Sequence, residues 1–240
     1  MLVATKAIVL NTIKFQDTSL IVKCYTKEGI KSYLLKGILS KNTKSKKLKI
    51  AFFQVFTLLD IIGNHNNKGK LNYIKEARVY YPFHSLNTNI YKSSIVIFLA
   101  EILTNVLKEE EKNIALFNYL ETSLIYLETH KETKNFHLLF LLKLTIYLGF
   151  FPEKNYEDAQ FFNLSKGVFS KNKPLDKYID TENLTLLKAI IGINFDAISK
   201  LNISATLRQS FLLFIIDYFA LHLPEFRKPK SLAILQTVFK

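Results

Sequence analysis

Seven residues decide the class of fold in the first third of the chain: Leu20-Ile21-Val22-Lys23-Cys24-Tyr25-Thr26. Successive side chains of a β-strand point to opposite faces of the sheet. The pattern therefore places Leu20, Val22 and Cys24 on one face and the intervening residues on the other. Alternation of this kind predicts a half-buried strand.

Four further runs within residues 1–80 are rich in β-branched and aromatic residues, with glycine and asparagine between them. They are Ala7–Leu10, Ile30–Lys36, Phe52–Ile62 and Leu71–Val79. Five short strands of this kind predict a small closed barrel, for which the OB-fold is the common five-stranded solution. An SH3-like barrel is the alternative that periodicity leaves open.

After Tyr81-Pro82 the apolar residues recur with a period near that of an α-helix, which predicts helices for the rest of the chain. The run Phe136–Leu148 is apolar nearly all round, so we expect it at the centre of a bundle. The other expected elements are a helix from a cap at Ser85 or Asn87 to Lys108, helices over 113–129, 180–191, 204–223 and 231–239, and a hairpin over Gln160–Phe169. The predicted fold class is α+β: an N-terminal OB-fold β-barrel over residues 1–80 and an all-α helical C-terminal domain over residues 81–240.

Positive charge is concentrated in the predicted barrel. Residues 1–80 hold 15 Lys and Arg against 4 Asp and Glu, whereas the remaining 160 residues hold 18 against 16. Six lysines and no acidic residue fall within Lys36–Lys49. A single charged run usually indicates a solvated loop, but a whole basic domain attracts polyanions, so we expect a nucleic acid as ligand.

Loops between the strands of a small barrel surround the face on which single strands lie, so lysines there are expected to contact phosphates. The predicted nucleic-acid-binding residues are Lys14, Lys23, Lys31, Lys36, Lys41, Lys44, Lys46, Lys47, Lys49, Lys68 and Lys70. Tyr25, Tyr33 and Tyr73 are candidates for stacking on bases, although a place in the barrel core or rim is the favoured reading for each. Arg78 is the one arginine of residues 1–80. Base-specific recognition by bidentate arginine is therefore not expected.

No catalytic or metal site is predicted, and no cofactor is expected. The sequence contains no Gly-rich phosphate loop ending in Lys-Ser/Thr, no Gly-x-Ser-x-Gly turn and no His-Glu-x-x-His motif. The single Cys24 excludes an intramolecular disulfide and an all-thiolate metal site within one chain. The start of the sequence lacks the pattern of a secretory signal, and no apolar run is long enough to span a membrane. We therefore expect a cytoplasmic binding protein rather than an enzyme.

Four stretches give the chain a resemblance to the RecO family of bacterial recombination mediators. Their order and spacing carry the likeness more than any one of them does. They are Ala7–Leu10 with Asp17–Val22, Tyr25–Lys31, the basic run Lys36–Lys49 followed by Phe52–Ile61, and His222–Phe226 with Lys230–Leu235.

The resemblance implies an N-terminal OB-fold that binds single- and double-stranded DNA and promotes strand annealing, in a mediator that helps to load recombinase during recombinational repair. It also implies a helical domain that binds RecR and the tail of single-stranded DNA-binding protein. An acidic, apolar tail needs an apolar groove beside a cation, for which Arg208, Arg227 and Lys228 are candidates by charge.

Many family members carry a four-cysteine zinc site in the helical domain, whereas residues 152–174 contain no cysteine. Zinc is therefore not expected here. Packing of Phe161, Phe162 and Phe169, instead of zinc, is expected to hold the hairpin.

Two other functions remain open from the residues alone. One is an OB-fold RNA-binding factor of translation or ribosome assembly, which a preference for substrates with a 2′-OH would favour. The other is a protein scaffold that does not bind DNA and whose charge attracts an acidic protein, which an absence of nucleic-acid binding at moderate salt would favour.

Overall fold

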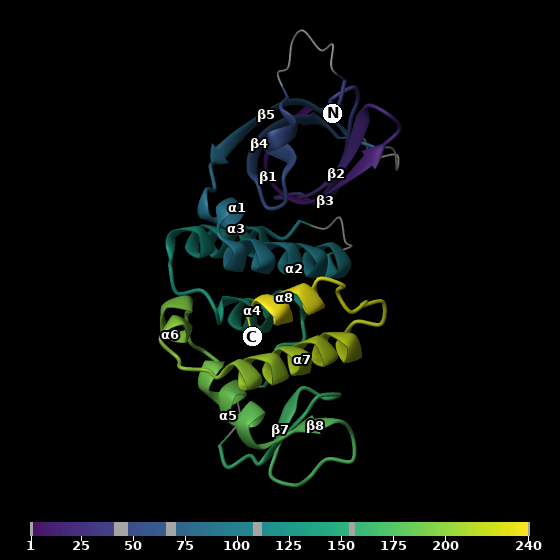
Figure 1. Cartoon of the computed structure of the whole chain (residues 1–240). Helices are drawn as coiled ribbons and strands as arrows, with labels where there is room; N and C mark the ends of the chain where they lie inside the picture. The colour runs from purple at the N-terminus through teal and green to yellow at the C-terminus, as the bar shows by residue number, and fades with distance from the viewer. Residues whose placement is uncertain (1, 41–47, 66–70, 108–111, 154–156, 240) are drawn as a thin grey trace. The chain divides into compact units, whose positions relative to one another are not determined.

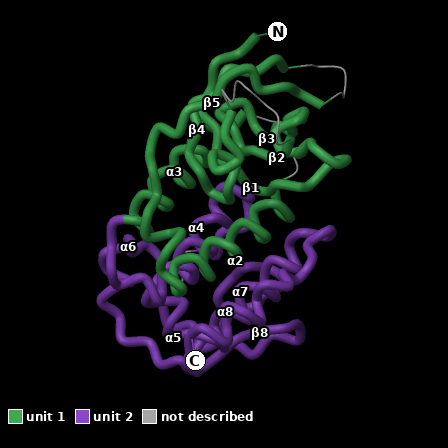
Figure 2. Tube along the Cα trace, turned by 45° about the horizontal axis from the view of Figure 1, so that its top comes forward, with its two compact units in different colours: residues 1–128 green, residues 129–240 purple. Residues whose placement is uncertain are grey.

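A computed structural model of the chain describes residues 2–40, 48–65, 71–107, 112–153 and 157–239. The chain divides into two compact units, residues 1–128 and 129–240 (Figure 2). Within the described residues, the N-terminal unit holds a five-stranded sheet followed by helices, and the C-terminal unit holds helices and a three-stranded sheet.

The sheet of the N-terminal unit is antiparallel, with the strand order β3-β2-β1-β4-β5. Its strands are β1 (Leu2–Phe15), β2 (Ser19–Thr26), β3 (Gly29–Leu35), β4 (Leu58–Asn64) and β5 (Tyr73–Tyr81), and they curve around a common interior (Figure 1). The edges β3 and β5 approach each other at one parallel bridge, between Tyr33 and Asn72, so the sheet is not closed. The structure confirms the predicted N-terminal OB-type sheet and helical C-terminal region, with a partly open barrel in place of the closed one.

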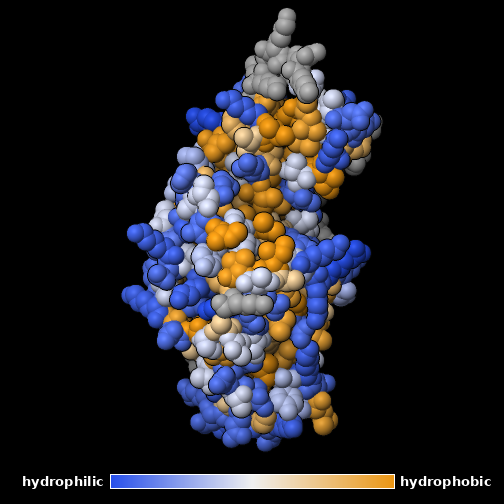
Figure 3. All heavy atoms as spheres, viewed as in Figure 1, coloured by the Kyte–Doolittle hydropathy of each residue, from blue (hydrophilic) through white to orange (hydrophobic). Residues whose placement is uncertain are grey.

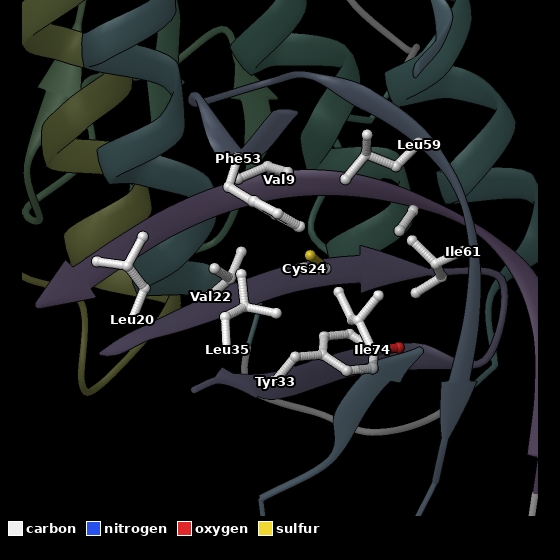
Figure 4. Packing of buried hydrophobic residues seen from close by; sticks show 11 residues of the cluster. Val9, Leu20, Val22, Cys24, Tyr33, Leu35, Phe53, Leu59, Ile61 and Ile74 are labelled. Atoms are coloured by element: carbon white, nitrogen blue, oxygen red, sulfur yellow. The ribbon is translucent and has the colours of Figure 1, made fainter. Parts of the chain in front are cut away.

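Alternate strand residues fill the interior of the sheet. Leu20, Val22 and Cys24 lie in one buried cluster with Val9 and Tyr33, as the alternation along β2 predicts (Figure 4). Burying a large apolar side chain contributes roughly 1.5–3 kcal/mol to folding. This core therefore stabilises the sheet and fixes which side chains of β2 point away from it.

The predicted strand over Phe52–Ile62 is wrong in its first half. Ile50–Phe53 forms a short 3-10 helix, η1, and β4 begins only at Leu58. Between them Phe56 adopts a φ of 63°, and its N–H donates to the carbonyl of Val9 at 2.7 Å. These apolar residues pack a turn against β1, which a run of apolar residues alone does not distinguish from a buried strand.

Three helices complete the N-terminal unit: α1 (Ser85–Thr88), α2 (Ile90–Val106) and α3 (Ile114–Thr129). The single helix expected from Ser85 or Asn87 is in fact two, because Asn89 caps α2 and its side chain accepts hydrogen bonds from the N–H groups of Tyr91 and Lys92. An Asn in this position satisfies N–H groups that have no partner within the helix.

The C-terminal unit contains α4 (Phe136–Leu148), α5 (Thr181–Ile190), α6 (Phe195–Ser199), α7 (Ala205–His222) and α8 (Leu232–Val238). Most of α4 is buried, as its all-round apolar pattern predicts. Helix α6 was not predicted from the sequence, because it is too short to show a periodic pattern. Among the described residues, no helix is long and apolar enough to span a membrane.

A small antiparallel sheet lies in the same unit, with the order β7-β6-β8. Its strands are β6 (Phe161–Asn163), β7 (Val168–Ser170) and β8 (Tyr178–Ile179). The Phe162 ring is fully buried, 4.9 Å from Phe169 and 6.0 Å from Phe214 between centroids. The turn between β6 and β7 needs glycine at position 167, where φ is 69°. A Cβ atom added there would lie 2.6 Å from the Tyr218 hydroxyl. Aromatic packing thus holds this hairpin, as expected.

The change from strands to helices occurs after Tyr81, where the sequence pattern changes. The compact units divide later, after Glu128, because α1, α2 and most of α3 are grouped with the sheet. The assignment of residues 1–80 to nucleic acid and of residues 81–240 to partner proteins stays a prediction.

Candidate nucleic-acid interface

The outer face of β2 is a docking surface for helices of the N-terminal unit. The Lys23 ammonium donates to the carbonyls of Thr104 at 3.0 Å and Leu107 at 3.4 Å, at the end of α2. A cation is favourable at a helix C-terminus, where unpaired carbonyls carry partial negative charge. Lys23 therefore anchors α2 in the described structure, and its predicted contact with phosphate stays a prediction.

Helix α3 is attached to the sheet through Tyr25, whose ring stacks on Phe117 with centroids 6.3 Å apart. Burial raises the pKa of the Tyr25 phenol to about 12, so the ring stays neutral. This contact makes Tyr25 part of the packing between sheet and helix, in agreement with the core reading.

A polar cluster joins α3 to strands β1 and β5 of the sheet. The Lys6 ammonium lies 2.9 Å from the Glu121 carboxylate, and the Tyr80 hydroxyl also donates to that carboxylate. Burial alone would raise the pKa of Glu121, but the hydrogen bonds from Tyr80 and Lys6 outweigh it, so the pKa is lowered. These residues were not predicted, because their pairing joins positions that are far apart in the sequence.

The seam between β3 and β5 is held by Asn72. Its N–H and its side-chain amide both donate to the Ser32 carbonyl, at 3.0 and 3.1 Å, and its own carbonyl accepts from the Leu34 N–H at 2.8 Å. Three hydrogen bonds thus fix the start of β5 against β3. These bonds fix the backbone directly before Tyr73.

Tyr73 and Lys36 form the most exposed pairing of an aromatic ring and a cation at this seam. The Tyr73 side chain is 46% exposed, while its neighbour Ile74 points into the core. The Lys36 ammonium lies 5.5 Å from the Tyr73 ring centroid. Lys36 is followed by a turn whose Gly37 N–H donates to the Ser19 hydroxyl. Of the three candidate stacking tyrosines, Tyr73 is the one whose ring reaches solvent.

Tyr33 belongs to the barrel core, which the sequence favoured over a role in base stacking. Its side chain is fully buried, and its hydroxyl lies 2.8 Å from Nε2 of His65. Burial, together with the charge of Lys31, lowers the pKa of His65, so this imidazole is neutral near pH 7.

The other predicted lysines fall into two groups. Lys14 and Lys49 are exposed, and Lys31 is half-buried. The second group lies outside the described residues and consists of Lys41, Lys44, Lys46, Lys47, Lys68 and Lys70. Of the predicted lysines, the structure brings Lys36 beside the Tyr73 ring and bonds Lys23 to the end of α2.

Apolar side chains also reach the surface of the N-terminal unit. Figure 3 shows them interspersed with hydrophilic ones on the visible face. Ile13 and Ile50 are 57% and 54% exposed, and Phe15 is 37% exposed. A surface that mixes cations with apolar groups suits unpaired nucleotides, which offer both phosphates and apolar base faces.

An open pocket of about 630 Å³ lies over β1, β4 and β5, and its lining carries both signs of charge. Lys6, Lys27 and Arg78 are balanced there by Glu28, Asp60 and Glu76. Such a lining does not favour a polyanion. Among the described residues, no three His, Cys, Asp or Glu side chains gather in the manner of a metal site.

The partner-binding candidates of the C-terminal unit differ in exposure. Arg208 is 7% exposed, and its guanidinium donates to the carbonyls of Ile203 at 3.1 Å and Phe239 at 3.4 Å. It therefore holds α8 against α7, and a contact with a partner would require this side chain to leave its site. Arg227 and Lys228 are both exposed.

Helix α7 exposes two leucines, and an acidic residue that pairs with two lysines lies between them; this surface is called the α7 stripe. Leu213 and Leu221 are 44% and 47% exposed, and Asp217 lies one helical turn from each. Asp217 accepts hydrogen bonds from Lys177 at 2.5 Å and from Lys228 at 3.0 Å. The predicted partner contact of Lys228 stays a prediction, and Lys177, which directly precedes β8, was not among the candidates because its pairing with α7 joins positions far apart in the chain.

Two family models match the chain in sequence order. Recombination protein O N terminal matches residues 1–83, and Recombination protein O C terminal matches residues 87–233. Curated relatives named DNA repair protein RecO align over their full length and over all of this chain. The protein of Christiangramia forsetii is 44% identical, that of Flavobacterium psychrophilum 43% and that of Phocaeicola vulgatus 34%. With both halves matched in order and with this identity over the whole length, the chain belongs to the RecO family.

Proposed function

We propose that this chain is a non-enzymatic recombination mediator that binds single- and double-stranded DNA in the cytoplasm and promotes strand annealing in recombinational repair. Family membership supports the repair role. Residues 1–80 contain 15 cationic and 4 acidic residues, and this positive charge supports DNA as the ligand. The observation that carries the proposal is the basic barrel, in which Lys36 begins one lysine-rich segment of the sequence and Tyr73 follows another, Lys68–Lys70, while both residues are exposed beside each other.

Annealing has a direct physical route on such a surface. Lysine ammonium groups neutralise phosphates as point charges, which lowers the repulsion between two strands. Weak stacking leaves the bases free to exchange partners. No proton transfer or bond cleavage is required, so the proposed activity needs no catalytic group.

The basic run supplies the first test. Lys44→Glu, Lys46→Glu and Lys47→Glu together should weaken binding of a labelled oligo-dT by at least about a hundredfold, because each reversal replaces an attraction to phosphate by a repulsion. Fluorescence anisotropy at fixed salt gives the dissociation constants. Thermal unfolding should change little.

A charge-matched variant separates the position of the charge from its amount. Lys131→Glu, Lys134→Glu and Lys200→Glu change the net charge equally, at exposed positions of the C-terminal unit. This variant should bind DNA almost as the unaltered protein does. Equal affinity of the two variants would exclude the basic run as the site.

We further propose that the helical region binds RecR and the acidic, apolar tail of single-stranded DNA-binding protein, the latter on the α7 stripe. Exposed Leu213 and Leu221 support this placement, and Lys177 and Lys228, which pair with Asp217 in the free protein, are the cations for the acidic groups of the tail. Leu213→Asp with Leu221→Asp should weaken binding of a tail peptide by about tenfold or more, through lost apolar contact and added repulsion. Ile146→Asp with Ile234→Asp, at two exposed positions on α4 and α8, is the matched control. Equal loss in the control would place the tail elsewhere.

A further inference from the structure

We infer that Tyr73 is a stacking site for an unpaired base and that Lys36 is the cation that pairs with the phosphate of the same nucleotide. The inference rests on the proposed function and assigns residues to it. Tyr73 offers an aromatic face at the surface, and Lys36 already has its ammonium 5.5 Å from the ring centroid. The ligand class is single-stranded nucleic acid with accessible bases.

The first reason is that the backbone at Tyr73 is fixed while the ring remains open to solvent. Asn72 forms three backbone-directed hydrogen bonds across the seam to Ser32 and Leu34. Tyr73 itself pairs with Asn64 in the sheet. A side chain on a fixed backbone loses little further freedom when a ligand stacks on it, so more of the stacking energy appears as affinity.

The second reason is the relation between ring and cation. An ammonium near an aromatic ring is attracted by the electrons of the ring face, which keeps Lys36 beside Tyr73 in the free protein. Its flexible stem lets the ammonium turn to a phosphate once a base covers the ring. One residue thus supplies apolar contact and the other charge, within a single nucleotide's reach.

The third reason is that the alternatives are engaged elsewhere. Tyr25 is stacked on Phe117, and Tyr33 is fully buried. Lys23 is bonded to the end of α2. A stacking role for either of those tyrosines would require helix α3 or the barrel core to open, whereas at Tyr73 only the flexible Lys36 side chain has to move.

The inference separates the contributions of the two residues. Tyr73→Ala should raise the dissociation constant for oligo-dT by about tenfold, the cost typical of losing one stacked base. It should leave the salt dependence and the affinity for blunt duplex DNA unchanged, since duplex bases are not available to stack. Tyr73→Phe should bind as the unaltered protein does, because the ring is retained. Lys36→Gln should weaken the binding of both oligo-dT and duplex DNA. For single strands it should reduce the magnitude of the slope of log binding constant against log salt concentration by about 0.7.

Tyr91→Ala removes a tyrosine that is 52% exposed on α2 of the same unit and serves as the matched control. Photocrosslinking of an oligonucleotide that carries 5-bromodeoxyuridine, followed by peptide mapping, gives a readout independent of affinity, and a crosslink at Tyr73 is expected. If the unaltered protein binds oligo-dT but Tyr73→Ala binds equally well and the crosslink lies elsewhere, the inference is wrong and the proposed function stands. Absence of binding by the unaltered protein even at low salt would overturn both.

Discussion

At the scale of single residues, Glu128 shows how one carboxylate organises a connection. It accepts hydrogen bonds from the N–H groups of His84, Ser85 and Leu86, between 2.9 and 3.0 Å, and from the Ser85 hydroxyl. A carboxylate at the start of α1 satisfies N–H groups that lack a partner within the helix. Lys92 adds a hydrogen bond to the Glu128 carbonyl at 2.7 Å. The end of α3 is thereby tied to the link between β5 and α1.

Glu128→Gln should lower the free energy of unfolding by roughly 1–2 kcal/mol at pH 7, because a neutral amide accepts these hydrogen bonds less strongly. Burial would raise the pKa of Glu128, but the backbone hydrogen bonds outweigh it and lower that pKa. A carboxyl with a lowered folded pKa contributes stability above its unfolded pKa, near 4.5, and loses it as the pH falls through the folded pKa. Denaturant unfolding at pH 7 and pH 3 should therefore show the difference between variant and unaltered protein shrinking in acid.

Glu132→Gln is the control, since Glu132 is exposed. It should change stability little at either pH. A difference for Glu128→Gln that stays constant between pH 7 and pH 3 would show that its ionised form is not what stabilises the fold.

At the scale of elements, α5 and α7 begin with different caps, although the sequence predicts both helices. The Ser204 hydroxyl accepts from the Leu207 N–H at 3.2 Å at the start of α7. Asp180 occupies the same position before α5 but makes no such side-chain hydrogen bond. Sequence thus located both helix starts, and only the structure distinguishes how each is capped.

Ser204→Ala should lower the free energy of unfolding by about 1 kcal/mol, because it leaves a helix N–H without its partner. Asp180→Ala, in the same unit, should lower the free energy of unfolding by less than half as much. Thermal unfolding followed by circular dichroism measures both. An equal or larger loss for Asp180→Ala would contradict the capping geometry.

At the scale of the whole molecule, the charge asymmetry sets how DNA binding depends on salt. If about five lysines contact phosphates, the logarithm of the binding constant for single strands should fall with the logarithm of salt concentration at a slope of about −3.5. The variant Lys44→Glu, Lys46→Glu, Lys47→Glu should reduce the magnitude of that slope by about two. Anisotropy titrations at several salt concentrations measure it. A slope near zero for the unaltered protein would mean that charge does not determine binding.

The sequence by itself determined the order and type of the main elements. Alternation placed Leu20, Val22 and Cys24 in the barrel core, and the all-round apolar pattern identified α4 as a buried helix. These features are local, since a strand or helix repeats over a few residues and burial follows from that repeat. The concentration of charge in residues 1–80 is likewise visible without a structure.

Only the tertiary structure decided which outward-facing residues remain at the surface. Lys23 and Tyr73 both appear in the sequence as residues on strands of a basic barrel. Helix α2 then engages Lys23, whereas Asn72 holds Tyr73 at the open seam beside Lys36. Whether a strand face meets solvent or a helix depends on contacts between residues about 80 positions apart, and a periodic pattern carries no information about such pairings.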